Sequence, residues 1–315
     1  MLLSLLQKTT VQDVEFVANL GDWPLSSKSK SALPMFSWCG SEDSYDIVLP
    51  TYELTESILH SQGRITTDIL STFGKQSMPY TQKENKLFWR GRDSHRARLK
   101  LIKLAQNDPS KFNVSITNFF FFRDEMHEYT NDASASSATA NETRKTKSSY
   151  VPFFDFFNYR FQLNIDGTVA AYRFPFLLAG NSLVIKQKSQ YYEFFYKQLQ
   201  SGIHYLSTRA DLSDLTEQLS MLINNNSSET TQNIKTIIWT ARKFVLSHLL
   251  PENVYCYYYN AISKYTQLLT TPVKLRPNVE LVTLDEDSQP MIVDKHKEKC
   301  ICNPENLQKN HHDEL

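Results

Sequence analysis

The alternation of short, branched apolar runs with longer helical stretches limits what this chain can fold into more than any other feature. Apolar runs bounded by turn-forming residues predict strands at 14–20, 46–49, 111–116, 163–165 and 182–185. Apolar residues at helical spacing predict helices at 96–106, 191–200, 212–223 and 232–248. Strands that alternate with helices are typical of parallel sheets covered by helices, so the sequence predicts an α/β fold.

Length and charge narrow the class of protein further. A chain of 315 residues is long enough for two compact domains. Its 34 Lys and Arg residues balance 34 Asp and Glu residues, which gives no electrostatic reason to bind nucleic acid or an anionic membrane. No window offers the ~18 apolar residues that a membrane helix requires. We therefore expect no nucleic-acid partner and no membrane span.

The chain ends in a four-residue retrieval signal for the endoplasmic reticulum: His312, Asp313, Glu314 and Leu315. This signal predicts residence in the lumen of the endoplasmic reticulum and binding to its retrieval receptor. The apolar run 1–6 is too short for a signal peptide and is followed by Gln7 and Lys8. We therefore expect an N-terminal part of the natural protein, with its signal peptide, to be missing from this sequence.

Cysteines and glycosylation sequons are compatible with the lumen. The cysteines suit one or two disulfides: Cys39, Cys256, Cys300 and Cys302. The last two are too close in sequence to pair comfortably with each other, and the pairing stays open. No Cys or His spacing matches a zinc site, so we predict no metal. Sequons that predict a glycoprotein occur at Asn113, Asn141, Asn225 and Asn226.

Two segments carry too few apolar side chains to predict packed structure. Residues 127–149 are rich in Ser, Thr and Ala, which predicts a flexible surface insertion. Residues 283–315 are predicted to form a loose tail, because a receptor must be able to reach the retrieval signal. In contrast, the phenylalanines in 119–122 and 153–157 are predicted to pack in the core.

An arginine-rich segment, FWRGRDSHRAR at 88–98, predicts an anion site. It reads as a strand end, a glycine turn and a helix start that together carry four arginines. Helix N-termini and guanidinium groups both bind phosphate oxygens, so a diphosphate would fit. A solvated basic helix start explains the same pattern equally well. The arginines are Arg90, Arg92, Arg96 and Arg98.

Two further segments follow predicted strands. Asp166 and Gly167 precede small residues and Arg173, and small residues let a ligand approach the backbone. Asp22 lies after the first predicted strand, at the edge where open α/β sheets bind ligands. Taken alone, both segments are more often ordinary turns than sites.

Five blocks together resemble one enzyme family. They are NLGDWP at 19–24, FSWCGSEDSYDIVLPTY at 36–52, FWRGRDS at 88–94, TNFFFF at 117–122 and DGTVAAYR at 166–173. The chain resembles the protein O-glucosyltransferases, in particular the KDEL-motif-containing members of glycosyltransferase family 90, whose domain is also called CAP10-like. The resemblance runs from about residue 14 to about residue 265. It departs at the N-terminus, where the family has a signal peptide, a filamin-like module and the first part of the catalytic domain.

The resemblance implies a GT-B fold, in which two Rossmann-like domains face each other across a cleft. Residues 1–78 would form part of an acceptor-side domain and residues 79–250 the nucleotide-sugar domain. Residues 251–282 would form a closing helix. In relatives the block around Cys256 pairs with a cysteine near the start of the catalytic domain, so we expect Cys256 to be unpaired here.

The resemblance also implies the reaction: inverting transfer of glucose from UDP-glucose to a serine of an EGF-like repeat, without metal or cofactor. Asp22 would be the general base, and Gly63 and Arg64 would contact the acceptor. The residues expected to bind the nucleotide sugar are Arg92, Asp93, Ser94, Arg98, Thr168, Val169, Ala170, Ala171, Tyr172 and Arg173. Two alternatives stay open, namely xylose transfer from UDP-xylose and an inactive, truncated lumenal binding protein.

Overall fold

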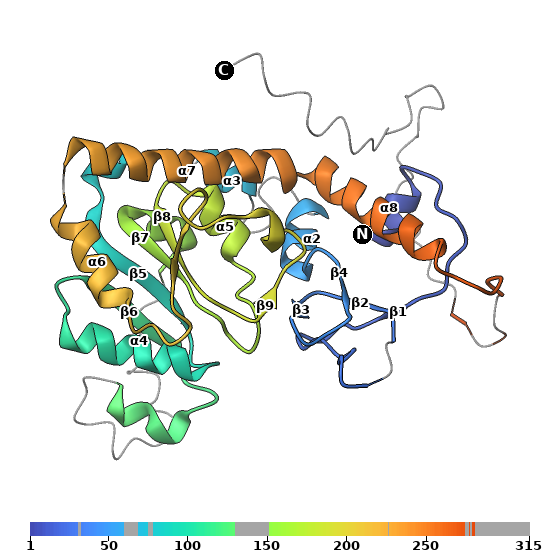
Figure 1. The fold of residues 1–315 in the computed structure, drawn as a ribbon, viewed down its shortest axis with the longest axis horizontal. Coiled ribbons are helices and arrows are strands. Elements are labelled where there is room, and N and C mark those ends of the chain that lie inside the picture. The colour runs from blue at the N-terminus through green and yellow to red at the C-terminus, as the bar shows by residue number, and fades with distance from the viewer. Residues whose placement is uncertain are drawn as a thin grey trace, which may run out of the picture.

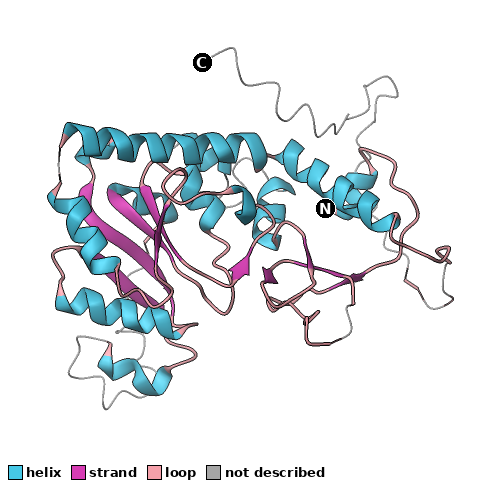
Figure 2. Cartoon of the chain, viewed as in Figure 1, coloured by secondary structure: helices cyan, strands magenta, loops and turns pink. Residues whose placement is uncertain are grey.

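The computed structural model describes residues 1–30, 33–59, 69–74, 78–129, 151–225, 227–274, 277 and 279–280 (Figure 1). These residues form parallel sheets covered by helices, which confirms the predicted α/β class (Figure 2). Gly63, Arg64, positions 130–149 of the predicted insertion and the tail at 283–315 lie outside the described residues. The predicted domain boundaries stay predictions.

The larger sheet has five parallel strands in the order β6-β5-β7-β8-β10. In chain order this is 2-1-3-4-5, so the order reverses between β5 and β7. Open parallel sheets bind ligands at the carboxyl ends of the strands beside such a reversal. The strands are β5 Glu84–Arg92, β6 Phe112–Asn118, β7 Tyr159–Asn164, β8 Leu183–Gln187 and β10 Leu206–Thr208.

Helices bury both faces of this sheet (Figure 1). The consecutive residues Leu87, Phe88 and Trp89 of β5 are all at most 1% exposed, as expected for a parallel sheet covered on both sides. Leu87 and Trp89 share a core cluster with α4 and α6, whereas Phe88 belongs to the cluster of α5 and α7. The helices are α3 Ile69–Gly74, α4 Arg96–Asn107, α5 Phe174–Ala179, α6 Leu215–Asn224 and α7 Ser228–His248.

A smaller unit precedes the main sheet in the chain. It contains a parallel sheet in the order β1-β2-β4, and its strand β3 pairs antiparallel with β9 beside the main sheet. Short 3-10 helices lie at Tyr80–Gln82 (η1), Arg123–Glu128 (η2), Phe153–Asn158 (η4) and Tyr196–Gln198 (η5). The elements of the smaller unit and its partner strand are α1 Leu2–Leu6, β1 Val17–Ala18, β2 Met35–Ser37, β3 Gly40–Ser41, β4 Ile47–Val48, α2 Tyr52–Leu59 and β9 Tyr191–Tyr192.

The last described helix, α8 Pro251–Thr266, extends from the end of α7 over the smaller unit (Figure 1). The Tyr257 hydroxyl donates to the Val48 carbonyl at 2.8 Å, and the Tyr258 hydroxyl donates to the Pro50 carbonyl at 3.1 Å. These bonds fasten the smaller unit to the C-terminal helices. Cys256 on α8 is disulfide-bonded, so the expectation that it is unpaired was wrong.

Segment 191–200 is not the predicted helix. Tyr191 and Tyr192 form β9, and only Tyr196–Gln198 is helical, as a 3-10 turn. The aromatic side chains that suggest helical spacing pack in different directions instead. Phe194 contacts Tyr257 on α8, whereas Phe195 contacts Phe174 and is fully buried. Tertiary packing and pairing with β3 therefore override the helical pattern.

Smaller corrections concern exposure. Phe120 and Phe121 are 60% and 55% exposed, so the predicted core role is wrong for these two. The Asn113 side chain accepts a hydrogen bond from Arg90 and donates one to Tyr159, which leaves this sequon unavailable for glycosylation in the folded chain. His127 and Glu128 belong to η2, so the predicted insertion cannot begin before Tyr129.

No helix in the described ranges is both long and apolar enough to cross a membrane.

Gly180, directly after α5, has no room for a side chain. A Cβ atom there would lie 1.9 Å from Cε1 of Phe157, which is buried. We expect Gly180→Ala to lower the free energy of unfolding by about 1–3 kcal/mol, because the core must move to admit the methyl group. Urea unfolding followed by circular dichroism measures this effect.

Gly74→Ala is the matched control for this substitution. No atom of the described residues lies within 4 Å of a Cβ at Gly74, so the same added methyl group meets none of the close contacts found at Gly180. If both alanine variants unfold at the same urea concentration as the unchanged chain, the close packing at Gly180 is wrong.

Candidate active site

A cavity of about 1160 Å³ lies at the carboxyl ends of β5 and β7, where the strand order reverses. Residues of the smaller unit form its opposite wall. The structure brings nearly all the described candidate residues together in this one cavity, although their roles stay predictions. Those that line it are Asp22, Arg92, Ser94, Arg98, Thr168, Val169, Ala170, Ala171, Tyr172 and Arg173.

Arg98 is the buried centre of the basic wall. Its guanidinium donates to the carbonyl oxygens of Arg92 at 2.9 Å, Ile165 at 3.2 Å and Asp166 at 2.7 Å, which joins the end of β5 to the loop after β7. A guanidinium has five N–H groups, so these three bonds to described residues leave two for a ligand. Burial lowers the pKa of Arg98 to about 9, and the nearby charge of Arg173 acts in the same direction. An anion bound in the cavity would stabilise the charged form of Arg98 and so oppose both the effect of burial and the repulsion from Arg173.

Two neighbours complete the basic wall. The guanidinium of Arg173 donates to the Arg90 carbonyl at 2.5 Å, and burial lowers its pKa. A Cβ atom at Gly167 would lie 3.0 Å from both Arg98 Nη2 and Ser94 Oγ. Glycine at this position therefore lets the loop after β7 approach the guanidinium closely. Together these groups form a pocket with positive charge and free donors, which suits phosphate oxygens.

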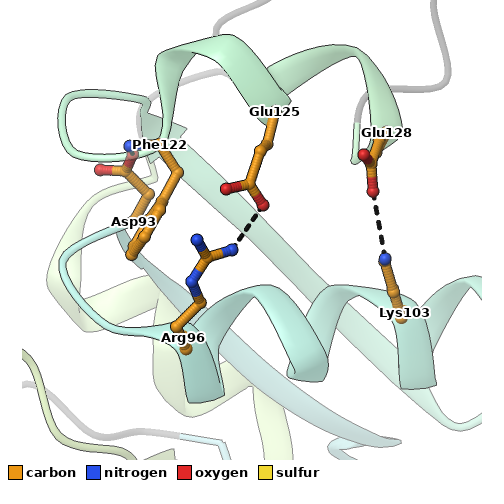
Figure 3. A network of polar contacts seen from close by, with 6 residues as sticks. All are labelled: Asp93, Arg96, Lys103, Phe122, Glu125 and Glu128. Carbon is orange, nitrogen blue, oxygen red and sulfur yellow. Dashed lines mark hydrogen bonds and ion pairs between the residues drawn. The ribbon is translucent and has the colours of Figure 1, made fainter.

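The other two arginines of the 88–98 segment direct their guanidinium groups to other partners, although Arg90 also lines the cavity. Arg90 donates to the Asn113 carbonyl at 2.9 Å and to its side-chain oxygen at 2.6 Å. Arg96 forms an ion pair with Glu125 at 2.6 Å and stacks on Phe122, on the outside of α4 (Figure 3). The predicted glycine turn is also wrong, because β5 continues through Gly91 with a register shift.

Asp93 was predicted to bind the nucleotide sugar, but it lies behind the cavity lining. Its fully buried carboxylate accepts hydrogen bonds from the backbone N–H groups of Phe120 at 2.9 Å and Phe122 at 2.7 Å. Figure 3 shows Asp93 beside Phe122. These bonds hold the loop that carries Phe121 into the cavity wall. The role that the structure gives Asp93 is therefore to position this loop.

Asp22 lies on an exposed turn whose backbone is held by the side chain of Asn19. The side chain of Asn19 accepts from the Gly21 N–H at 2.9 Å and donates to the Trp23 carbonyl at 2.6 Å, so it closes the turn around Asp22. Asp46 accepts from the backbone N–H groups of Leu25 and Ser26 just beyond. The cavity thus has a carboxylate held on one wall and arginines on the other.

Sequence comparison identifies the family. Residues 1–313 match the sequence profile of glycosyl transferase family 90. The chain belongs to this family. It is 43% identical over 288 residues to protein O-glucosyltransferase 2 of Danio rerio, which covers 91% of this chain and 54% of the relative. It is 39% identical over 291 residues to protein O-glucosyltransferase 3 of Homo sapiens, which covers 91% of this chain and 53% of the relative.

The family 90 chain thus spans about half the length of these curated relatives. Among solved structures, Anabaena HepE in complex with UDP and glucose aligns with 71% of this chain and 57% of its own. The TM-score is 0.40 and the sequence identity is 11%.

Several cavity residues of this family 90 chain escape prediction from the sequence. Tyr52, Glu53 and Glu56 line it from the start of α2, and Phe121 and Phe153 add aromatic surface. Burial raises the pKa of Glu53 to about 7; a hydrogen bond from Tyr52 opposes this, and the charges of Asp22 and Glu56 add to it. Acidic residues are ordinary at a helix start, so the sequence offers no signal that separates these from a cap.

Cys39 lies directly behind the cavity-lining loop 168–173. It is a fully buried free thiol that packs against Val169, Ala170 and Tyr172. Burial raises its pKa to about 12, so it stays protonated and supports the loop by packing rather than by chemistry.

Among the described residues, no three His, Cys, Asp or Glu side chains are grouped so that they could hold a metal ion.

Proposed function

We propose that this chain is an inverting protein O-glucosyltransferase that transfers glucose from UDP-glucose to a serine of an EGF-like repeat. The observation that carries the proposal is the cavity at the strand-order reversal, with Arg98 and Arg173 on one wall and Asp22 on the other. The relatives are named as protein O-glucosyltransferases, which supports the reaction class. The EGF-like acceptor rests on the family resemblance, and the lumenal location and the retrieval receptor rest on the C-terminal HDEL.

In this mechanism Asp22 accepts the proton of the serine hydroxyl. The hydroxyl oxygen forms a bond to the anomeric carbon on one face of the sugar while the bond to UDP breaks on the other. One displacement therefore inverts the configuration and needs one base, with no carboxylate nucleophile. The electron pair leaves with the UDP oxygen, and Arg98 and Arg173 stabilise the charge that develops on the diphosphate. The arginines thus take a role for which other enzymes use a metal ion, and we propose that none is needed.

Mass spectrometry of a folded EGF-like repeat incubated with the purified chain and UDP-glucose or UDP-xylose tests this proposal. We expect a gain of one hexose that disappears in Asp22→Asn. A gain of one pentose instead would show that the donor is UDP-xylose. No gain from either donor would contradict the enzymatic proposal for this chain and favour a binding protein.

A further inference from the structure

Among the described residues that line the cavity, three carry a buried polar atom without a hydrogen-bond partner: Arg90 at Nε, Glu53 and Tyr172. Within the described part of the chain, neither Oε2 of Glu53 nor the hydroxyl oxygen of Tyr172 makes a hydrogen bond, and both atoms are shielded from solvent. Tyr172 as a whole is 8% exposed. Both residues line the cavity. An unpaired buried polar atom is costly and rare in folded proteins, so each calls for an explanation, and a ligand in the cavity supplies one for both.

These two atoms belong to one corner of the cavity. The ring of Tyr52, next to Glu53 in the chain, packs edge-on against the ring of Tyr172 with centroids 5.8 Å apart. Burial raises the pKa of the Tyr172 phenol, and the charges of Asp22 and Glu53 add to this effect. The phenol is therefore a firm O–H donor, and beside it the Glu53 carboxyl offers an acceptor.

The charges around the corner select the ligand chemistry. An anionic group would be repelled by Asp22, Glu53 and Glu56, which all line this side of the cavity. A cationic group would be disfavoured by Arg173, which is close enough for the charge of Glu53 to act on its pKa. A neutral hydroxyl group both donates and accepts, so it matches an acceptor beside a donor.

We propose that Glu53 joins Tyr172, which the family resemblance already assigns to the nucleotide sugar, and that both bind hydroxyl groups of the sugar that is transferred. This inference rests on the proposed function, because the diphosphate site at Arg98 and Arg173 and the base Asp22 define where the sugar lies. The transferred ring must lie between the leaving diphosphate and the base. Glu53 lines the same cavity as Arg173 and Asp22 and is close enough to both for their charges to interact, so the corner lies near both groups.

The burial of Glu53 has a consequence for stability that separates ligand binding from a structural role. The pKa of Glu53 in the folded chain, about 7, is above its ordinary value, so its contribution to stability is favourable at low pH. That contribution is lost as the pH rises from the ordinary value of a glutamate through about 7. Glu53→Met removes both carboxyl oxygens at similar side-chain length. We therefore expect the variant to melt at a higher temperature than the unchanged chain at pH 8.

Titration calorimetry with UDP, UDP-glucose and UDP-xylose tests the proposal on the full chain. We expect Glu53→Met and Tyr172→Phe each to bind UDP-glucose about tenfold more weakly, the effect of one lost hydrogen bond to a polar ligand, while the UDP affinity is unchanged. Equal losses for both sugars would place the contact on the hydroxyls that they share. A loss for UDP-glucose alone would place it on the extra hydroxymethyl group.

Glu252→Gln is the matched control, because it removes a carboxylate from the first turn of α8, outside the cavity lining. It should bind all three ligands as the unchanged chain does. If Glu53→Met changes UDP and UDP-glucose equally, or neither, the hydroxyl-binding role is wrong while the proposed function stands. If Glu53→Met lowers the melting temperature at pH 8, Glu53 is structural. An unchanged chain that binds neither UDP nor UDP-glucose would overturn the proposed function and this inference together.

Discussion

Replacing Asp22 with asparagine is expected to lower the rate of sugar transfer by about 10²–10⁴-fold, the usual contribution of a general base. Asparagine has nearly the same shape, but its amide cannot take the proton of the serine hydroxyl. Asp22 lies on an exposed turn that Asn19 holds through backbone groups, so the fold should be unaffected. Initial rates of UDP release in the presence of an EGF-like repeat measure the effect, and calorimetry should show unchanged UDP affinity.

Asp43→Asn is the control for this prediction. Asp43 is an exposed aspartate of the same small unit and is outside the cavity lining, so its substitution should leave the rate unchanged. Undiminished turnover in Asp22→Asn would remove Asp22 from the mechanism. A parallel loss of UDP affinity would mean that the substitution acts on the donor site and not on proton transfer.

Local patterns in the sequence predict the main sheet well. The helix predicted at 96–106 is α4, and the strands predicted at 111–116 and 182–185 are β6 and β8. These elements are recognisable because α4 buries one face at helical spacing, whereas β8 is a continuous apolar run buried on both faces. In both cases the pattern of apolar residues follows the backbone geometry. Segment 191–200 breaks this relation. Its aromatic residues serve two different surfaces, and periodicity alone cannot tell one buried face from two.

The candidate site is predictable where function depends on consecutive residues, as in the loop from Thr168 to Arg173. It is less predictable where neighbouring residues point in different directions. Asp93 lies between Arg92 and Ser94, which line the cavity, yet its side chain points away to hold the loop at Phe120. Glu53 reaches the cavity from a distant helix start, through a tertiary arrangement that no short-range pattern encodes.

Replacing Arg98 with methionine is expected to weaken UDP binding by about 10- to 100-fold and to lower the free energy of unfolding by about 2–4 kcal/mol. The first effect comes from losing a charged donor to the diphosphate. The second arises because the carbonyl oxygens of Arg92, Ile165 and Asp166 lose their shared donor, partly offset by removing a buried charge. Arg98→Lys keeps the charge without the planar fork, so it should recover some affinity but little stability.

A destabilised chain can bind weakly simply because less of it is folded, so this prediction needs a variant that separates the two effects. Gly180→Ala provides it, because its clash with Phe157 destabilises the core without touching the cavity lining. Calorimetry at low temperature, where both variants are folded, should show near-normal UDP affinity for Gly180→Ala and a large loss for Arg98→Met. UDP should also raise the melting temperature of Gly180→Ala much more than that of Arg98→Met, since stabilisation by a ligand follows its affinity for the folded state. Equal affinities in the two variants would show that Arg98 only holds the loops together and that the diphosphate is bound elsewhere.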